Sequence, residues 1–498
     1  MALIDRLAPL RAHRGQRRTQ GLDDATIARF AATHAELIEA IEAAEQEHAR
    51  IKVEFAELLE MDEDAQIQAV QAGYVNFYPD DAVNPYIALA ARGPWVVTLK
   101  GAVLHDSGGY GMLGFGHAPK HVIAAMAKPQ AMANIMTPSL SQLRFESAIR
   151  AAIGTSRGGC PYEKFLCLNS GSESVSLAAR IADVNTKLMT DAGGKHAGRT
   201  VKRVVVKGSF HGRTERPALY SDSSRKTYVQ YLASFRGEDS VITVEPYDVE
   251  ALKQVFTDAD TNGWFIEAMF LEPVMGEGDP GRGVPPAFYA AARELTRNHG
   301  ALLLVDSIQA GLRAHGVLSI IDYPGFEKLD PPDMETYSKA LNAGQYPLSV
   351  LAVGKRAADL YKKGLYGNTM TTNPRALDVA CAVMEQVTPA LRENIRARGA
   401  EALAKLEALK AEMGGLITKV QGTGLLFSCE LDPQFKCYGA NSTEEWLREH
   451  GIGVIHGGVN SLRFTPTFTI TSEEIDLLVA MVGRALREGP RKQQAAAA

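Results

Sequence analysis

The chain has 498 residues, which is too long for one compact core, so we expect two or three domains. Hydrophobic residues make up 46% and charged residues 22%, the balance of an ordinary globular protein. The net charge of -5 gives no basis for a nucleic-acid partner, and no apolar run approaches the roughly 18 residues that span a bilayer. The start of the chain shows no secretory signal. The five cysteines are scattered and form no CxxC pair, so we expect no zinc site, no disulfides and a cytoplasmic setting.

The first 70 residues differ from the rest of the chain. Apolar or near-apolar residues from Ile27 to Leu58 recur at spacings of three and four, which predicts a long helix with room for one break. Asp23 or Asp24 can cap its start. The pattern leaves two hypotheses open: an extension that packs on its own subunit, or a dimerisation arm. His34 falls on the apolar stripe, where a partly buried side chain is favoured over a metal-binding or pH-sensing one.

The predicted elements then follow in chain order. Short β runs at 94–99 and 102–105 are typical of a hairpin. Between residues 162 and 353, apolar strands alternate with helices, which indicates a mostly parallel sheet with helices on both faces. We expect strands at 165–168, 203–206, 268–271, 301–305 and 349–353, helices at 175–189, 286–298 and 374–387, and a strand-rich region at 417–431. We divide the chain into a helical extension (1–70), the first part of a small domain (71–115), a large domain (116–374) and a C-terminal small domain (375–498).

Two short polar motifs follow strands. Ser170-Gly171-Ser172 lies between an apolar strand and a helix, where backbone N–H groups and the helix dipole favour a phosphate. A helix cap explains the same residues equally well. Phe210, also after a strand, is an aromatic side chain that can stack on a planar ring, and His211 beside it is either a polar contact or a loop residue.

Two charged residues are candidates for chemistry. Asp306 ends the apolar strand 301–305, where a carboxylate is poorly placed for packing and well placed for a ligand such as a pyridinium nitrogen. Capping of a following helix is the alternative. Lys339 lies among small residues between apolar flanks, and a sheltered lysine becomes a nucleophilic amine, although a single lysine is usually solvated.

In this order, the elements resemble the class III (ornithine/ω-amino acid type) aminotransferases of fold type I, which use pyridoxal 5'-phosphate (PLP). The resemblance runs from about residue 78 to 486 and rests on six segments: 104–119 ("LxDxxxG…LGHxHP"), 271–278 ("EPxxGEGG"), 305–312 ("VDEVQTGxGR"), 338–341 (the cofactor lysine), 369–374 ("TxGGNP") and 462–466 ("LRFxP"). It implies an α/β fold: a large domain with a mostly parallel seven-stranded sheet between helices, and a small α+β domain.

The resemblance also implies roles for individual residues. Lys339 would carry PLP as a Schiff base and then act as general base and acid, and Asp306 would pair with the pyridine nitrogen. The implied cofactor-binding residues are Ser170, Gly171 and Ser172 at the phosphate, Phe210 and Ile308 on the two ring faces, Gln309 at the phenolic oxygen, His211, and Thr369 reaching the phosphate of the neighbouring subunit. Thr369 therefore implies a homodimer with shared active sites, and a tetramer is left open.

The implied substrates are an ω-amine or a basic or ω-amino acid and a keto acid, 2-oxoglutarate paired with glutamate. Arg463 would grip a substrate carboxylate, and Glu277 would neutralise Arg463 when an amine end enters; Glu272 completes the substrate set. A decarboxylase or an aminomutase of the same family is the alternative. A non-catalytic PLP-binding sensor is more remote, because such sensors carry a basic DNA-binding module and this N-terminal extension is rich in glutamate.

Four departures from the family pattern bear on the substrate rather than on the cofactor. Ser307 replaces a usual Glu, Met275 a frequent Gln, and Asp279 a second Gly, and Thr371-Thr372 replaces Gly-Gly.

Overall fold

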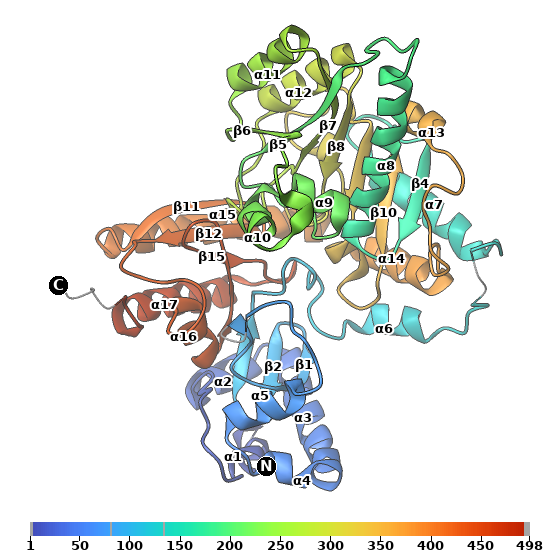
Figure 1. Ribbon diagram of the computed structural model, residues 1–498. Helices are drawn as coiled ribbons and strands as arrows, with labels where there is room; N and C mark the ends of the chain where they lie inside the picture. Colours follow the sequence, from blue (N-terminus) through green and yellow to red (C-terminus); the bar gives the residue numbers. More distant parts are fainter. Residues whose placement is uncertain (1–2, 80–81, 133–134, 493–498) are drawn as a thin grey trace. The chain divides into compact units, whose positions relative to one another are not determined.

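The computed structural model describes residues 3–79, 82–132 and 135–492, and these form two compact units (Figure 1). The unit called small here comprises Met1–Lys120, Ala397–Gln421 and Phe427–Ala498, and the large unit comprises His121–Arg396 and Gly422–Leu426. The four-part domain division made from the sequence stays a prediction. No helix in the described ranges is long and apolar enough to cross a membrane.

The large unit is built on a seven-stranded sheet with the strand order β4-β10-β9-β8-β7-β5-β6. Its strands are β4 (Lys164–Leu168), β5 (Thr200–Val206), β6 (Val241–Val244), β7 (Trp264–Leu271), β8 (Leu302–Asp306), β9 (Met334–Tyr337) and β10 (Ser349–Val353). Only β10 runs antiparallel to its neighbours β4 and β9, and the other pairs are parallel. The predicted mostly parallel sheet is confirmed, and the short strands β6 and β9 are additional to those expected.

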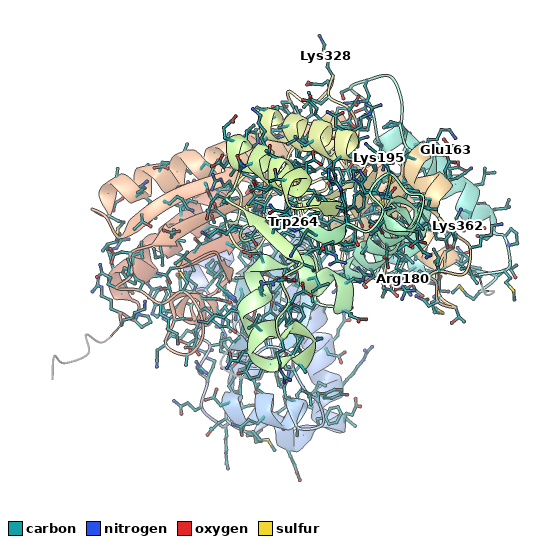
Figure 2. The ribbon with its side chains drawn as sticks, turned by 45° about the horizontal axis from the view of Figure 1, so that its top comes forward. Glu163, Arg180, Lys195, Trp264, Lys328 and Lys362 are labelled. Atoms are coloured by element: carbon teal, nitrogen blue, oxygen red, sulfur yellow. The ribbon has the colours of Figure 1, made fainter. Side chains whose placement is uncertain are left out.

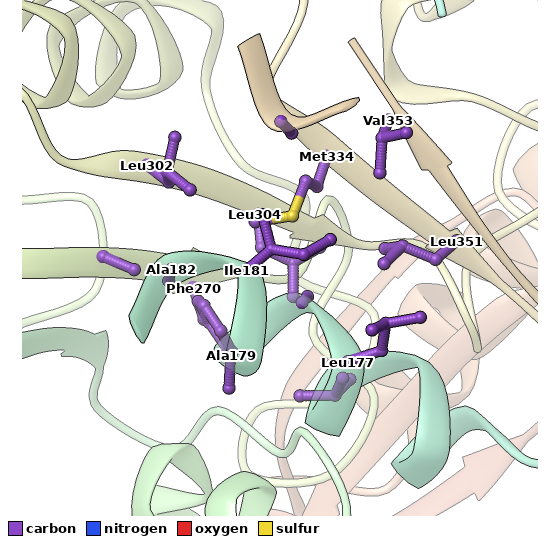
Figure 3. Close-up of a cluster of buried hydrophobic side chains, with 14 of the residues drawn as sticks. Leu177, Ala179, Ile181, Ala182, Phe270, Leu302, Leu304, Met334, Leu351 and Val353 are labelled. Atoms are coloured by element: carbon purple, nitrogen blue, oxygen red, sulfur yellow. The ribbon is translucent and has the colours of Figure 1, made fainter. Parts of the chain in front are cut away.

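Helices cover this sheet on both faces. The α-helices between residues 120 and 386 are α6 (Lys120–Ala127), α7 (Leu140–Ala152), α8 (Gly171–Thr190), α9 (Glu215–Tyr220), α10 (Arg225–Tyr231), α11 (Val249–Thr261), α12 (Pro286–His299), α13 (Lys355–Leu360) and α14 (Pro374–Gln386), and of these α8, α11 and α12 contact β7, while α8 and α12 also contact β8. The apolar face of α8, with Leu177 and Ile181, packs on β8 and β10 side chains such as Leu304 and Leu351, which form one buried cluster (Figure 3). Helices α11 and α12 pack against β7 from the other side (Figure 1). Alternate strand residues thus face different helices, which explains the continuous apolar runs in the sequence.

On the neighbouring strands β5 and β7, polar side chains pair with one another beside the apolar core. Trp264, labelled in Figure 2, begins β7, and Lys202 on β5 places its Nζ 5.4 Å from the centre of the indole ring. Beside them, Glu267 is fully buried and accepts hydrogen bonds from Arg203 Nε at 3.1 Å and from Tyr220 OH at 2.8 Å. A buried carboxylate is tolerated here because a cation and a hydroxyl satisfy it.

The small unit begins with helices, and the predicted long helix is broken more than once. It is divided into α2 (Asp24–Ala31), α3 (Ala35–Glu54) and α4 (Ala56–Leu59), after α1 (Ala8–Arg11) and before α5 (Glu63–Gln71). The breaks fall at His34 (φ -114°, ψ 95°) and Phe55 (φ -137°, ψ 47°), whose backbones are not helical. The predicted cap is confirmed, since the Asp23 carboxylate accepts the N–H of Thr26 at 2.8 Å.

These helices pack on the first strands of the same chain. The expected apolar stripe is buried at Ile27, Phe30, Leu37 and Ile41, and α3 contacts β1 (Ala88–Arg92) and β2 (Trp95–Thr98). The extension therefore packs on its own subunit, as one of the two hypotheses required. The predicted hairpin is confirmed by antiparallel pairing of β2 with β3 (Val103–Asp106).

The C-terminal part supplies the rest of the small unit. It contains α15 (Pro389–Glu412), which crosses the boundary between the units, β11 (Ile417–Thr423), β12 (Leu426–Leu431), α16 (Thr443–Glu449), β13 (Ile452–Gly453), β14 (Ile455–Gly457), β15 (Ser461–Phe464) and α17 (Ser472–Glu488). One sheet has the order β1-β2-β3-β13 and the other β11-β12-β15-β14. Residues from both ends of the sequence thus share one α+β unit.

Candidate active site

A cavity of about 170 Å³ lies in the large unit, at the carboxyl ends of its strands. Its lining residues follow β4 (Ser170, Gly171, Ser172), β5 (Phe210, His211, Gly212), β7 (Glu272), β8 (Asp306, Ile308, Gln309) and β9 (Ser338, Lys339). Ligands in α/β sheets bind at this edge, because loops and helix N-termini converge there. Nine of the residues predicted from the sequence to bind a cofactor meet in this cavity.

The first wall of the cavity is the N-terminus of α8. Ser170 caps the helix, its Oγ accepting the N–H of Glu173, while Glu173 Oε2 accepts the N–H of Ser170 at 3.1 Å. The helix runs for 20 residues, so its dipole favours an anion here. Space is tight, because a Cβ at Gly171 would lie 2.6 Å from Ile308 Cδ1. The motif is thus a helix cap, and the same helix end presents the backbone N–H groups and dipole that favour an anion.

The floor of the cavity holds a buried carboxylate and imidazole. Asp306 Oδ2 lies 2.9 Å from His211 Nδ1, and Asp306 Oδ1 accepts the N–H of Ile308 at 3.1 Å. Both side chains are buried, with Asp306 4% and His211 1% exposed. Asp306 caps a turn through one oxygen, and no helix of the described chain begins there, so the helix-capping alternative for Asp306 is wrong.

Two buried nitrogens at this floor have no partner within the described chain. They are His211 Nε2 and Gln309 Nε2. A buried polar atom without a hydrogen-bond partner costs about 1–3 kcal/mol, so each of the two would gain from a polar ligand in the cavity.

Glu272 forms another part of the lining. Its Oε2 accepts the N–H of Phe210 at 3.0 Å and its Oε1 accepts the N–H of Gly276 at 3.0 Å. Burial raises the pKa of Glu272 to about 7; His211 opposes this rise, and Asp306 adds to it. Each carboxylate oxygen of Glu272 already accepts a backbone N–H that shapes the cavity. The predicted contact with substrate therefore requires one oxygen to accept a second hydrogen bond.

Lys339 enters the cavity directly after β9. Its backbone φ is +48°, in the left-handed region that non-glycine residues rarely adopt. The preceding Ser338 Oγ donates to Leu348 O at 2.7 Å, which anchors the turn from outside. Strained backbone conformations persist where surrounding contacts hold them in place, and they are concentrated at functional sites.

Three predicted site residues do not line the cavity. Thr369 is exposed on the segment before α14, next to Asn368, which accepts a hydrogen bond from Asn169 at 3.0 Å. Glu277 lies 4.0 Å from Arg213. Arg463 belongs to the small unit, is 1% exposed, and places its guanidinium carbon 5.4 Å from the Tyr110 ring centre.

Arg213 is a candidate that the sequence prediction missed. Its guanidinium carbon lies 5.1 Å from the centre of the Phe210 ring, besides the approach to Glu277. Arg213 stands three residues after Phe210 in the same strand-following motif, and that proximity was the available signal. Gly212, also missed, has φ +108°, and a Cβ there would lie 2.4 Å from Ser172 Oγ.

The departures from the family pattern are accommodated locally. Thr372 has φ +60°, so a threonine takes the conformation for which glycine is usual. Met275 is buried, and Asp279 pairs with Arg282 at 3.2 Å. Ser307 is fully buried and donates to Glu335, as described below.

A strand-end cavity with an anion-binding helix, a buried carboxylate and a sheltered lysine defines a class of enzyme that binds a phosphorylated aromatic cofactor. The model of the family "Aminotransferase class-III" matches residues 77–486. The acetylornithine aminotransferase of Xanthomonas campestris is 32% identical over 319 residues, 62% of this chain and 71% of that protein. Ornithine aminotransferase 2 of Staphylococcus aureus is 30% identical over 324 residues, 64% and 74% of the two chains. The ornithine aminotransferase structure from Toxoplasma gondii has a TM-score of 0.72 at 25% identity and covers 88% of this chain and 98% of its own.

The chain belongs to the class-III aminotransferase family and is a PLP-dependent aminotransferase of fold type I. A Toxoplasma gondii relative of the same fold is described with PLP at its active site. The residues in the cavity fit that group: an anion site at α8, an aromatic face at Phe210, a carboxylate at Asp306, and an amine at Lys339. The partnerless nitrogens of His211 and Gln309 point to a polar ligand at the same place.

Proposed function

We propose that Lys339 and Asp306 are the catalytic residues of this aminotransferase. The observation that supports this most directly is their convergence, from β9 and β8, on one cavity that also contains an anion site. PLP, when bound, supplies a conjugated ring that takes up the electrons released when a carbon–hydrogen bond of the amine breaks. Positioned proton transfer of the kind assigned to Lys339 contributes roughly 10²–10⁴-fold to a rate.

The protein's own steps follow from this placement. Lys339 Nζ would hold the cofactor and would then move a proton between the two carbons that exchange the amino group. Asp306 would keep a proton on the ring nitrogen, while His211 fixes the carboxylate orientation through Nδ1 at 2.9 Å. Phe210 and Ile308 would lie against the two ring faces, and Gln309 would donate to the ring oxygen.

The α8 N-terminus would hold the phosphate through Ser170, Gly171 and Ser172, helped by the helix dipole. Thr369 would reach the phosphate of a second subunit. Its exposed position leaves the side chain accessible to a second subunit.

For the substrates, we propose an ω-amino or basic amino acid as one amino donor and glutamate/2-oxoglutarate as the second pair. The named relatives act on ornithine or acetylornithine, which supports the first. The presence of Arg463 and Glu277 supports the second, since a guanidinium grips a carboxylate with two parallel hydrogen bonds. Arg213 lies 4.0 Å from Glu277. It is a further cation, and a substrate carboxylate could take the place of Glu277 beside it.

We further propose a homodimer with shared active sites, located in the cytoplasm. Apolar side chains are exposed on and before α7, with Met136 80%, Leu140 69% and Leu143 67% exposed. A surface of this kind is typical of a protein–protein interface. Sedimentation of the protein at several concentrations tests the dimer.

The test of the catalytic proposal is the visible absorbance of the protein with PLP, followed as L-glutamate is added. Loss of the long-wavelength band, restored by 2-oxoglutarate, is expected. Lys339→Ala should abolish this cycle, whereas Lys355→Ala, at a lysine side chain that is 77% exposed, should leave it unchanged. A band that glutamate leaves untouched would contradict the glutamate assignment, and full turnover by Lys339→Ala would contradict the role of the lysine.

A further inference from the structure

A further carboxylate, besides Asp306 and Glu272, lies behind the cavity on β9. Glu335 is fully buried, four residues before Lys339. Its Oε1 accepts hydrogen bonds from Ser307 Oγ at 2.6 Å and from the N–H of Ile320 at 2.9 Å. Its Oε2 accepts from Tyr162 OH at 2.6 Å and from Ser319 Oγ. A buried carboxylate is costly unless it is satisfied, and these four donors satisfy it.

Three of these four donors belong to one segment. Ser307 begins the chain segment 307–320 that leaves β8, and Ser319 and Ile320 end it. The single carboxylate of Glu335 therefore accepts hydrogen bonds from both ends of the loop 307–320. The loop start is fixed a second time, because the N–H of Ser307 donates to Thr336 O on β9 at 3.0 Å.

The loop closed in this way carries two residues of the cavity. Ile308 packs against the start of α8, where a Cβ at Gly171 would come within 2.6 Å of its Cδ1. Gln309 lies on the other side, where a Cβ at Gly276 would come within 1.8 Å of its Oε1. Both contacts leave little room, so a small shift of the loop would change the shape of the cavity at two walls.

We propose that Glu335 is a positioning residue for the cofactor, which holds the segment 307–320 closed and so keeps Ile308 and Gln309 in place against PLP. This rests on the proposed function of the cavity. It also gives a reason for the departure at Ser307, where the family usually has a glutamate: the carboxylate comes from the neighbouring strand, and the serine hydroxyl meets it.

The chemistry of the carboxylate predicts which substitutions matter. In Glu335→Gln, the remaining oxygen can keep Ser307 and Ile320, and the new amide can donate to the hydroxyls of Ser319 and Tyr162, which rotate to accept. The loop should stay closed. In Glu335→Leu, all four hydrogen bonds are lost. The 319–320 end of the loop is released, and the 307 end keeps only the bond from its N–H to Thr336 O.

The experiment measures PLP dissociation constants by equilibrium dialysis and the visible circular dichroism of bound PLP, together with urea unfolding of the apoprotein. Loss of residues that orient the direct ligands of a bound metal costs roughly 10–100-fold in affinity, and by analogy we expect Glu335→Leu to weaken PLP binding about tenfold. Its dichroism band should change, because the ring orientation changes. Glu335→Gln should stay within about threefold of the wild type, as a conservative rescue.

The matched control is Glu267→Leu, on β7 of the same sheet. Glu267 is also fully buried and multiply hydrogen-bonded, but its partners Arg203 and Tyr220 do not line the cavity. This variant should lose stability while keeping the PLP dissociation constant and the dichroism band. Equal weakening of PLP in Glu267→Leu and Glu335→Leu, or unchanged PLP binding in Glu335→Leu, would overturn the proposal.

A folding failure does not end the test. If Glu335→Leu does not fold, the double variant Ser307→Ala/Ser319→Ala removes one hydroxyl contact to Glu335 at each loop end and keeps the backbone bond from Ile320. It should weaken PLP binding in the same direction, by less than Glu335→Leu. If the wild type itself binds no PLP, the proposed function fails; if it binds PLP and the double variant binds equally well, only the role of Glu335 fails.

Discussion

Two buried histidine–carboxylate pairs, one in each unit, use the same chemistry differently. In the large unit, His211 Nδ1 lies 2.9 Å from Asp306. In the small unit, His105 Nε2 lies 3.1 Å from Glu474, with His105 fully buried and Glu474 2% exposed. The nitrogen–oxygen distances and the burial of the side chains are therefore nearly equal. The two pairs differ in the hydrogen-bond partners of their other nitrogen and oxygen atoms.

The pair in the small unit is completed by protein groups. Glu474 Oε2 accepts the N–H of Thr471 at 2.7 Å and its hydroxyl at 2.8 Å, which caps α17, and His105 Nδ1 lies 3.2 Å from Ser107 Oγ. The pair in the large unit lines a cavity, and His211 Nε2 has no partner in the described ranges. A satisfied pair indicates a structural role, and an incomplete one at a strand end indicates a ligand.

The largest expected effect comes from breaking the pair in the cavity. Asp306→Asn keeps the size of the side chain and removes the charge that would hold a proton on the PLP ring nitrogen. We expect kcat to fall by about 10²–10³-fold, the usual cost of losing one preorganised electrostatic partner. Steady-state kinetics with saturating PLP measure this, and urea unfolding of the apoprotein should change little. A variant with wild-type kcat would show that the carboxylate has no part in the reaction.

The sequence identified the strand-end positions well because their signal is local. Asp306 ends an apolar run, Lys339 lies among small residues between apolar flanks, and the glycine and two serines at 170–172 stand between a strand and a helix. A parallel sheet brings such ends to one edge without any further information. The fold class and the strand–helix alternation were predictable for the same reason.

The partners of these residues were not predictable, because they depend on contacts between distant segments. Glu335 lies in a four-residue strand that the pattern did not reveal, and its donors come from positions up to 173 residues away. His105 and Glu474 are 369 residues apart. The break at His34 also needed the structure, since heptad spacing continues through it.

A smaller effect, on stability alone, is expected for the pair in the small unit. Burial by itself would raise the pKa of Glu474, but hydrogen bonds and charge from His105 and His34 hold it well below the usual value of 4.5. A carboxyl group with a lowered pKa stabilises the folded protein at pH values above the pKa that it has in the unfolded chain. This stability is lost as the pH falls through the acid range. Glu474→Gln should cost about 3 kcal/mol at neutral pH and flatten the acid limb of the stability curve.

Urea unfolding between neutral and acid pH measures this, with kcat at saturating PLP as the second readout. The comparison requires that kcat per folded molecule stay near the wild-type value. If Glu474→Gln lowered kcat as much as Asp306→Asn does, a satisfied pair would not be evidence of a structural role, and the distinction drawn above would be wrong.

The smallest expected effect belongs to the third member of the small-unit cluster. His34 Nε2 lies 3.6 Å from Glu474 Oε2, and this carboxylate raises the pKa of His34, against the effect of burial. Glu473 adds to the rise, and Glu36 also faces Glu474. A histidine with a raised pKa stabilises the folded protein at pH values below 6.5, its pKa in the unfolded chain. This contribution disappears as the pH rises through the pKa of His34 in the folded protein. His34→Gln should therefore cost about 0.5–1 kcal/mol near pH 6 and almost nothing near pH 9, measured as the difference in urea midpoints from the wild type. Because His34 also occupies the N-cap position before α3, a pH-independent loss would mean that it acts through the helix start rather than through its charge, and His105 would then be the histidine that holds Glu474 ionised.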